Sequence, residues 1–242
     1  MAKRIYWDAG HGGSDPGAVA NGLKEKDLAI KVVKAAVSYM KANYECEVYQ
    51  DITADSLNTI CARSNKWKSN LFVSVHFNAG GGDGWEGLVY SSSNKKLGQT
   101  FEKRVKAIGQ NSRGVKYRPD LAVLRLTDCK SILNECAFID NKKDIKDWDS
   151  DAELKKMGEA LAKAAADFLN LKSKKPKQQK VPFKVKAKTN LKVREKSSLT
   201  SKVLDKVAKK GEVYTIVKVN GNRGELKAGG WITITSKYVE IV

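Results

Sequence analysis

Residues 71 to 79 read Leu-Phe-Val-Ser-Val-His-Phe-Asn-Ala, and this apolar run is the centre of the fold that the sequence predicts. Five of its first seven residues are apolar, most of them β-branched or aromatic, and glycines follow at positions 80, 81, 82 and 84. This pattern is typical of a buried strand that ends in a loop. His76 lies where the strand ends, and in open α/β sheets ligands bind beyond the carboxyl ends of the strands. We therefore expect His76 to face a site and not the core.

His11, the other histidine of the chain, has the same setting. It follows a short strand predicted over residues 3–7 and lies in the loop Ala-Gly-His-Gly-Gly-Ser-Asp-Pro-Gly of residues 9–17. Both imidazoles are thus placed at the ends of predicted strands. Because neutral imidazole is a common metal ligand, the pair suggests a metal site.

Length and composition limit the other possibilities. The chain has 242 residues, of which 41% are hydrophobic, and this is enough for one sizeable core and a small second domain. It contains no apolar run near the roughly 20 residues needed to span a bilayer, and residues 1–6 show no apolar signal core. We therefore expect a soluble chain that is made in the cytoplasm and has no membrane partner.

The four cysteines, Cys46, Cys61, Cys129 and Cys136, form no Cys-x-x-Cys pair and are scattered among apolar positions. Reduced, buried thiols are the expected state, in preference to a disulfide or a thiolate zinc site. A thiol nucleophile would need a histidine base, and both histidines already have the metal role. We therefore assign the cysteines no chemistry.

The net charge of +18 is concentrated in the C-terminal part of the chain. Residues 172–242 hold 19 Lys or Arg against 5 Asp or Glu, a balance of +14, which leaves +4 for residues 1–171. Residues 172–180 have no apolar residue except Pro176, and their like charges repel, which is typical of an extended linker. We predict a first domain over residues 1–171, this basic linker, and a second domain over residues 181–242.

Strand and helix patterns alternate along the first domain, which predicts an α/β fold with a mostly parallel, twisted sheet flanked by helices. The predicted strands cover residues 3–7, 46–49, 71–76, 88–91, 122–126 and 131–138, and the predicted helices cover residues 25–43, 57–69, 97–109 and 152–171. The second domain differs in kind. Its short alternating runs, separated by Gly, Asn, Ser and Lys, predict a small all-β barrel.

A catalytic zinc ion takes three protein ligands and leaves a fourth position for water, so the two histidines need a carboxylate beside them. The candidates near the loop of His11 are Asp8, Asp15, Glu25 and Asp27. Glu25 opens the first predicted helix close to the strand ends, although an acidic residue in a first helical turn often only complements the helix dipole. The spacing alone leaves the four carboxylates open.

Glu135 lies in the otherwise apolar stretch Ile-Leu-Asn-Glu-Cys-Ala-Phe-Ile of residues 132–139. A buried, unpaired carboxylate is costly, so it needs a cation, a hydrogen-bond donor or a function. One interpretation is a salt bridge to an arginine such as Arg63 or Arg125. The other is a general base toward an attacking water and then an acid toward a leaving nitrogen, with burial raising the pKa of Glu135.

Four motifs occur in order along the first domain: Asp-Ala-Gly-His-Gly-Gly (8–13), Leu-Lys-Glu-Lys-Asp (23–27), Ser-Val-His-Phe-Asn-Ala (74–79) and Asn-Glu-Cys-Ala-Phe-Ile-Asp-Asn (134–141). Over about residues 3–171 they resemble the zinc-dependent N-acetylmuramoyl-L-alanine amidases of the Amidase_3 type. The resemblance implies that His11, Glu25 and His76 bind Zn2+ and that Glu135 is catalytic. Cys136 departs from the small residue or proline that is common at its position, and it is not a predicted ligand.

The C-terminal part resembles the bacterial SH3 (SH3b) modules of cell-wall proteins. Its marks are Asn-Leu-Lys-Val-Arg at 190–194, Lys-Gly-Glu-Val at 210–213 and Gly-Trp-Ile-Thr-Ile at 230–234. The whole layout is similar to that of phage endolysins, and a sporulation autolysin released by mother-cell lysis would share it. The resemblance implies synthesis in the host cytoplasm and action on the cell wall after release.

The resemblance to the amidases implies hydrolysis of the amide bond between N-acetylmuramic acid and L-alanine in peptidoglycan. The rival hypotheses are a zinc peptidase that cuts within the stem peptide and a non-catalytic wall-binding protein that kept the scaffold. The basic tail predicts anionic cell-wall polymers as partners. Nucleic acid comes second, because the tail has no stacking-aromatic or basic-helix pattern. We also expect a groove near residues 80–87, with Trp85 at its edge, to receive the stem peptide.

Overall fold

The computed structural model describes residues 2–174 and 180–242, which belong to two compact units, Met1–Lys174 and Lys175–Val242. Of the predicted linker, residues 175–179 lie outside the described residues. The linker's first residues continue the first unit, because Glu45 N donates to Lys172 O at 2.9 Å and Lys174 N donates to Asn43 O at 2.7 Å. Across the two described ranges, no helix is both long and apolar enough to cross a membrane.

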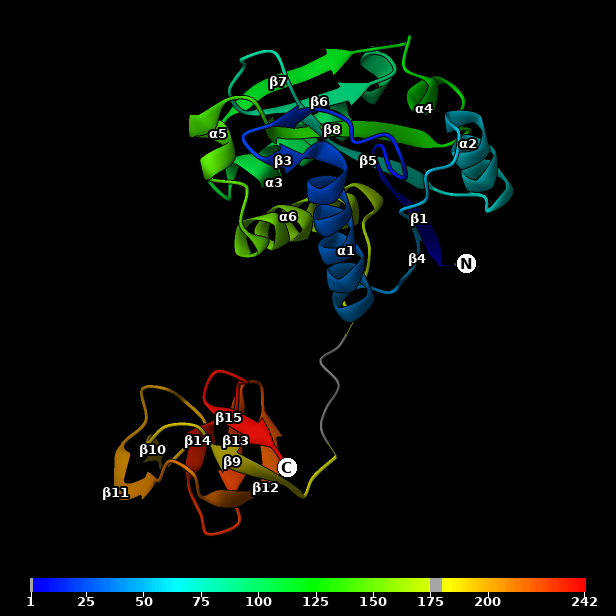
Figure 1. Ribbon diagram of the computed structural model, residues 1–242. Helices are drawn as coiled ribbons and strands as arrows, with labels where there is room; N and C mark the ends of the chain where they lie inside the picture. The colour runs from blue at the N-terminus through cyan, green and yellow to red at the C-terminus, as the bar shows by residue number, and fades with distance from the viewer. Residues whose placement is uncertain (1, 175–179) are drawn as a thin grey trace. The chain divides into compact units, whose positions relative to one another are not determined.

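A six-stranded sheet forms the centre of the first unit, with the strand order β4-β1-β5-β8-β6-β7 (Figure 1). Its strands are β1 (Lys3–Ala9), β4 (Cys46–Asp51), β5 (Leu71–Asn78), β6 (Trp85–Val89), β7 (Ser112–Tyr117) and β8 (Lys130–Phe138). Every neighbouring pair is parallel except β6 and β8, which run antiparallel. The predicted mostly parallel sheet is confirmed, and the strand that contains His76 lies in its middle.

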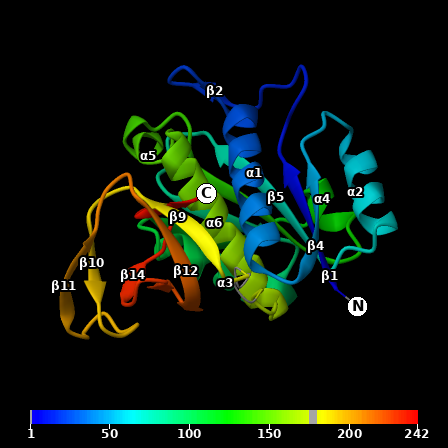
Figure 2. The same cartoon turned by 90° about the horizontal axis from the view of Figure 1, so that it is seen from below.

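Helices cover the sheet in two separate layers (Figure 2), and alternating side chains of the strands pack against one layer or the other. The helices are α1 (Glu25–Asn43), α2 (Leu57–Lys66), α3 (Lys95–Lys106), α4 (Ala122–Arg125), α5 (Lys142–Lys146) and α6 (Asp151–Leu169). Ile5 and Trp7 belong to the larger core, which α1, α3 and α6 cover. Tyr6 and Phe72 belong to a smaller core under α2 and α4. This period of two is what a sheet covered on both faces requires.

The smaller helical layer covers only part of its face, because α2 has 10 residues and α4 has 4. Tyr6, Phe72 and Leu133 of the smaller core lie on β1, β5 and β8. Every second residue after them along these strands points to the same face of the sheet as they do. The residues that follow in this way are polar: Asp8 on β1, Ser74 and His76 on β5, and Glu135 on β8. The carboxyl ends of these strands therefore carry a polar surface on the α2 side of the sheet.

The predicted strand over residues 122–126 is wrong, because Ala122–Arg125 forms the short helix α4. Leu121 O accepts hydrogen bonds from Leu124 N at 3.1 Å and from Arg125 N at 3.0 Å, which closes a helical turn. Val123 and Leu124 both pack into the smaller core, whereas neighbours on a strand would face opposite layers. Short apolar runs do not distinguish one helical turn from a strand. The edge strand β7 and the short helix α5 were also absent from the prediction.

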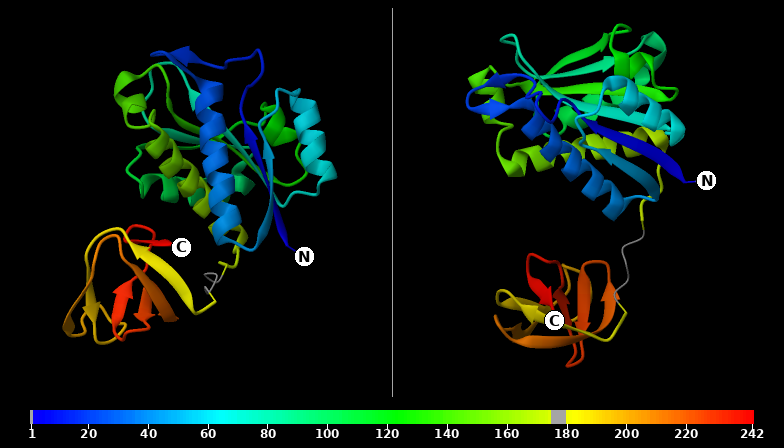
Figure 3. Two further views of the ribbon diagram at one scale, coloured as in Figure 1. Left: turned by 60° about the horizontal axis from the view of Figure 1, so that its bottom comes forward. Right: turned by 45° about the vertical axis from the view of Figure 1, so that its right-hand side comes forward.

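The second unit is an antiparallel structure with the strand order β11-β10-β14-β13-β12-β9-β15 (Figure 3). Its strands are β9 (Phe183–Ala187), β10 (Leu191–Arg194), β11 (Val203–Ala208), β12 (Val213–Asn220), β13 (Arg223–Leu226), β14 (Trp231–Thr233) and β15 (Val239–Ile241). Val185, Val193, Ile216 and Ile232 are buried in its own small core. The all-β prediction for this part of the chain is confirmed.

Helices α1 and α6 pack closely against each other at Gly158. A Cβ atom on Gly158 would overlap the backbone carbonyl oxygen of Val32 and crowd Ala35 and Ala36. All three contacts are with backbone atoms or the Cβ atom of a residue of α1, so these groups cannot rotate away. The two helices could accept a larger residue at Gly158 only by moving apart.

Gly158→Ala is expected to lower the free energy of unfolding by about 1–2 kcal/mol, because an overpacking cost of about 2–3 kcal/mol outweighs the roughly 1 kcal/mol that alanine gains over glycine in a helix. Lys155→Ala, at an exposed position of the same helix, is the control, with an expected change below about 0.5 kcal/mol. Denaturant titrations followed by helical circular dichroism report the first unit, since the described part of the second unit has no helix. A Gly158→Ala chain as stable as wild type would contradict the close packing.

Candidate metal centre and catalytic carboxylate

His11, Glu25 and His76 converge at the carboxyl ends of β1 and β5. One ligand atom from each side chain can be chosen so that all three lie within 4.8 Å of one another. His11 Nε2 is 3.2 Å from Glu25 Oε2, and His76 Nδ1 is 2.9 Å from Glu25 Oε1. The centres of the two imidazole rings are 5.1 Å apart. The carboxylate therefore lies between two imidazoles that are distant in the sequence.

Glu25 is fixed by backbone amides. It is the first residue of α1, and it accepts hydrogen bonds from Ala18 N at 2.9 Å and Phe77 N at 3.0 Å. Burial alone would raise the pKa of Glu25, which is 4% exposed, but the hydrogen bonds from His76 and the two amides outweigh this effect and lower it. The side chain is therefore ionised at neutral pH, as a metal ligand must be.

The loop after β1 presents His11 in a strained conformation. The backbone φ of His11 is 63°, in the left-handed region that costs a non-glycine residue about 1–3 kcal/mol. Asp15 closes the loop, since its Oδ2 is 2.7 Å from His11 Nδ1 and its Oδ1 accepts a hydrogen bond from Gly17 N at 2.9 Å. Such strain persists only where the surroundings enforce it, and it is found mainly at functional sites.

Two glycines make the close approach of these side chains possible. A Cβ atom on Gly10 would overlap the imidazole ring of His76. A Cβ atom on Gly17 would collide with the ring of His11 and with the carboxylate of Glu25. The glycines of this loop therefore provide the space that the cluster occupies.

The donor set of the cluster fits a zinc ion. Two imidazole nitrogens and one carboxylate oxygen are the protein ligands of catalytic zinc sites that keep a fourth position open. The other ring nitrogen of His11 contacts Asp15, and such a carboxylate partner orients a metal-ligating imidazole. The side chains of His11 and His76 are 27% and 19% exposed, so a fourth ligand can reach the cluster from solvent.

The structure separates the four carboxylates that spacing left open. Glu25 lies between the histidines, whereas Asp15 contacts His11 at Nδ1, on the side of the ring away from Glu25. Asp27 is exposed on α1. Asp8 is buried on β1, where burial raises its pKa to about 6. Only Glu25 among the four belongs to the cluster of ligand atoms.

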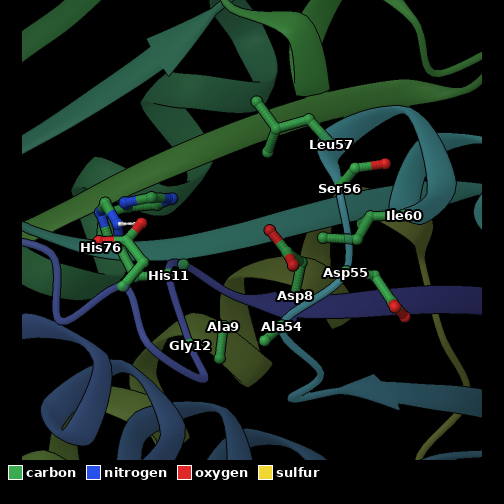
Figure 4. A pocket seen from close by; sticks show the side chains of 12 residues that line it. Asp8, Ala9, His11, Gly12, Ala54, Asp55, Ser56, Leu57, Ile60 and His76 are labelled. Carbon is green, nitrogen blue, oxygen red and sulfur yellow. Dashed lines mark hydrogen bonds and ion pairs between the residues drawn. The ribbon is translucent and has the colours of Figure 1, made fainter.

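A cavity of about 330 Å³ opens beside the two histidines (Figure 4). Its other walls come from β1, from the loop after β1, from the segment between β4 and α2, and from the first turn of α2, and they include Asp8, Asp15, Ala54, Asp55, Leu57 and Ile60. These walls are aliphatic and acidic. The cavity therefore favours neutral or cationic groups over anions.

Glu135 lies next to His76 on the neighbouring strand β8, with the two residues in register. Its Oε2 is buried and has no hydrogen-bond partner among the described residues. Burial raises the pKa of Glu135 to about 7, and the negative charges of Glu25 and Glu86 act in the same direction. A carboxylate with this pKa can both accept and return a proton near neutral pH.

The salt bridges considered for Glu135 are not formed within the described part of the chain. Arg63 donates to Asp51 Oδ2 at 2.5 Å and also pairs with Asp55. Neither Arg63 nor Arg125 is a hydrogen-bond partner of the buried Glu135 Oε2. Ion pairing therefore does not explain the costly burial of this carboxylate. This favours the other interpretation, a role as general base.

Glu86 is a second buried carboxylate of the site, and it was absent from the predicted site residues. It is 5% exposed on β6 and is in register with Glu135 of β8. Its Oε1 accepts hydrogen bonds from Arg113 Nε and Lys116 Nζ, both at 2.6 Å. Burial would raise the pKa of Glu86, but these two cations outweigh it and lower the pKa. The signal that could have found it is an acidic residue within an apolar strand.

The glycine-rich loop after β5 is held by a side chain that follows β8. Asp140 Oδ2 accepts hydrogen bonds from Gly80 N at 2.7 Å and Gly81 N at 2.9 Å. The expectation that Trp85 lies at the edge of a groove here is wrong, because Trp85 is fully buried. It begins β6, packs in the larger core, and donates from Nε1 to Asn134 Oδ1 at 3.3 Å.

All four cysteines are free thiols. Cys61 and Cys136 are buried, and burial raises the pKa of both. No cysteine belongs to the cluster of His11, Glu25 and His76.

Residues 5–167 match the model of the family Amidase_3, described as N-acetylmuramoyl-L-alanine amidase. The endolysin of Bacillus phage SPP1 is 38% identical over 273 residues, covering 100% of this chain and 99% of that relative. The sporulation-specific N-acetylmuramoyl-L-alanine amidase of Bacillus subtilis (strain 168) is 31% identical, with 76% of each chain covered. In both cases the matched region is therefore much longer than a single shared motif.

A solved structure also resembles this chain. The catalytic domain of CwlV, an N-acetylmuramoyl-L-alanine amidase from Bacillus (Paenibacillus) polymyxa var. colistinus, has a TM-score of 0.66 and 27% sequence identity. The match covers 70% of this chain and 99% of that chain.

Asp15→Asn is expected to weaken Zn2+ binding by about tenfold or more, because the neutral amide loses the charge-assisted contact that orients His11. Asp27→Asn makes the same chemical change at an exposed position, and its Zn2+ affinity is expected to equal that of wild type. Competition titrations against a chromophoric chelator give the dissociation constants. Equal affinities for Asp15→Asn and wild type would remove Asp15 from the metal site.

Proposed function

The chain belongs to the Amidase_3 family of N-acetylmuramoyl-L-alanine amidases, and from this premise we propose that it cleaves peptidoglycan in a zinc-dependent reaction. The bond is the amide between N-acetylmuramic acid and L-alanine. The observation that carries the proposal is the cluster of His11, Glu25 and His76, with the unpaired carboxylate of Glu135 on the next strand. Metal-assisted hydrolysis needs such a ligand set with a base beside it.

His11, Glu25 and His76 are the residues that would hold the ion. A bound Zn2+ supplies a Lewis acid that polarises the scissile carbonyl and lowers the pKa of the attacking water. Asp15 orients His11 toward the cluster, and the backbone amides fix Glu25, so the ligands need little rearrangement.

Glu135 carries the proton of the reaction. As water attacks the carbonyl carbon of the lactyl group, the Glu135 carboxylate takes a proton from it. It then gives this proton to the amide nitrogen as the carbon–nitrogen bond breaks. The products are the carboxylate of the muramic acid and a free amino terminus on L-alanine. The unpaired Oε2 and the pKa near 7 suit both proton transfers.

A zinc peptidase that cuts within the stem peptide is the rival reaction for the same ligand set. The two reactions differ in the amino terminus that they release. Digestion of purified peptidoglycan with and without a chelator, read by mass spectrometry, separates them. New L-alanine amino termini that vanish on chelation and return with Zn2+ support the proposal. Termini at other stem residues, or cleavage that chelation leaves unchanged, would reject it.

Glu135→Gln is expected to lower turnover by about 10³-fold, because the amide cannot accept the proton of the attacking water. Zn2+ remains bound, since Glu135 is not one of the clustered ligands. Glu159→Gln on α6 is the control. The rate of release of L-alanine termini and the metal content of the purified chain are measured together. Substantial turnover by Glu135→Gln would exclude Glu135 as the base.

The second unit is proposed to hold the enzyme on the cell wall as an SH3b-like module that binds anionic wall polymers. Residues 181–242 hold 14 Lys or Arg against 5 Asp or Glu, a balance of +9. Exposed lysines alternate with buried residues along the strands, as with Lys184, Val185 and Lys186 on β9. A surface of this charge attracts polyanions. In this proposal the enzyme is made in the host cytoplasm and reaches the wall after release, as a phage endolysin does.

Binding of residues 181–242 to purified cell walls is expected to weaken by about tenfold or more between low salt and about 0.5 M salt, because salt screens the attraction between charges. Co-sedimentation measures the bound fraction, and walls stripped of their anionic polymers are the matched control. Binding that salt leaves unchanged would indicate recognition by a specific pocket instead.

A further inference from the structure

Three neighbouring side chains connect the reaction centre to the edge of the sheet. His76 on β5, Glu135 on β8 and Glu86 on β6 are in register, and side chains in register point to the same face. Neighbouring strands lie about 4.8 Å apart, so Glu86 is about 10 Å from His76 along this row. The edge strand β7 comes next.

Arg113 of β7 ends the row with a guanidinium that is fixed but not saturated. Its Nε donates to Glu86 Oε1 at 2.6 Å, and its Cζ lies 5.3 Å from the centre of the Phe138 ring. Nη1 and Nη2 form no hydrogen bond with the described part of the chain, and the side chain is 44% exposed. The guanidinium therefore keeps paired donors that can bind a carboxylate in a bidentate manner.

Lys116 adds a second cation at the same place. Its Nζ is also 2.6 Å from Glu86 Oε1, and its side chain is 45% exposed. Two cations thus share one buried carboxylate, which leaves an excess of one positive charge facing solvent. Such an excess attracts an anionic group of a ligand.

The opposite side of the reaction centre is acidic. The cavity beside His11 and His76 is lined by Asp8, Asp15 and Asp55. The two sides of the reaction centre therefore differ in charge, and this difference orients a substrate that has one neutral arm and one anionic arm. The cations attract the anionic arm, and the acidic cavity repels it.

We propose that Arg113 and Lys116 bind the α-carboxylate of the second stem residue, a glutamate that is linked through its γ-carboxyl group. The proposal rests on the amidase function above. In such a stem this carboxylate is the first anion after the scissile amide. It lies about 7 Å beyond the scissile nitrogen, since an extended residue spans at most about 3.6 Å. From Glu135, this reach extends past Glu86, which is one strand spacing away. It falls short of β7 itself, but the side chains of Arg113 and Lys116 extend back from β7 to Glu86 Oε1.

This assignment orients the whole substrate. The stem peptide crosses β8 and β6 toward the edge strand β7, and the neutral muramoyl sugar lies toward the aliphatic and acidic cavity near Asp8. Arg113 and Lys116 then determine specificity for the stem. Glu86 is a positioning residue, because it holds both cations and does not itself contact the carboxylate.

The test uses two soluble muramyl tetrapeptides that differ only at the second stem residue, which has either a free α-carboxylate or an α-carboxamide. The full, zinc-loaded chain is assayed for cleavage of the L-alanine amide, and the ratio of the two kcat/KM values is the readout. Wild type is expected to prefer the carboxylate by about tenfold, the size of a charge-assisted bidentate contact, with the difference mainly in KM.

Two variants probe the cations without leaving a lone buried carboxylate. Arg113→Lys keeps the charge near Glu86 but removes the paired donors, and the ratio is expected to fall to about threefold. Glu86→Gln combined with Arg113→Gln and Lys116→Gln removes both cations together with the carboxylate that they share, and the ratio is expected to approach one. Arg104→Gln is the control, since Arg104 is similarly exposed and its Nε also bonds a carboxylate, that of Asp167. Its ratio is expected to equal that of wild type.

A wild-type ratio near one overturns the assignment, as does a tenfold ratio that persists in the triple variant. Cleavage of intact peptidoglycan by wild type is measured in parallel. If L-alanine termini appear there while the ratio is near one, the amidase function stands and only the carboxylate site is rejected. If the termini appear elsewhere in the stem, the proposed function itself is rejected.

Discussion

The geometry of the site depends on the hydrogen bonds of the Glu25 carboxylate. One of its oxygens faces His11 and accepts from Ala18 N, and the other faces His76 and accepts from Phe77 N. A single buried side chain therefore joins the loop after β1, the start of α1 and the end of β5. Because these donors meet the desolvation cost of the carboxylate, the charge can be kept beside the two imidazoles. Loss of Glu25 would remove one of the three proposed metal ligands and also release the two histidines from their orientation.

The alternation of the strands determines which side chains reach a substrate. His76 and Glu135 share a face with the residues under α2 and α4, while Val75 and Phe77 lie in the core under α1 and α6. A shift of β5 by one residue would turn His76 into the larger core and expose Val75. The register is fixed by apolar residues on both faces, so it is strongly determined. The short α2 and α4 leave the carboxyl ends of this face uncovered, and the chemistry is found there.

The sequence predicts those parts of the site that local patterns control. His11 and His76 are recognisable because each follows an apolar run that ends in a glycine-rich loop, and the structure places them together. Spacing does not select Glu25 among its neighbours, because the selection depends on backbone amides that only the folded loop brings near. The burial of Trp85 and Glu86 depends on the pairing of β6 with β8, and the sequence of a five-residue strand does not reveal its partner. An aromatic residue after glycines therefore suggests an exposed edge, although this one is core.

Glu86 and Glu135 illustrate how neighbouring strands give two carboxylates different functions. Both are largely shielded and in register, so burial acts on both in the same direction. Arg113 and Lys116 contact Glu86 and hold its pKa below the ordinary value, whereas Glu135 has no such partner and its pKa rises to about 7. A carboxylate that is permanently ionised can position cations but is a poor proton carrier, and one that titrates near neutral pH has the opposite properties. The cations must therefore bind Glu86 and leave Glu135 alone, since an arginine turned toward Glu135 would lower the pKa that the proton transfer requires.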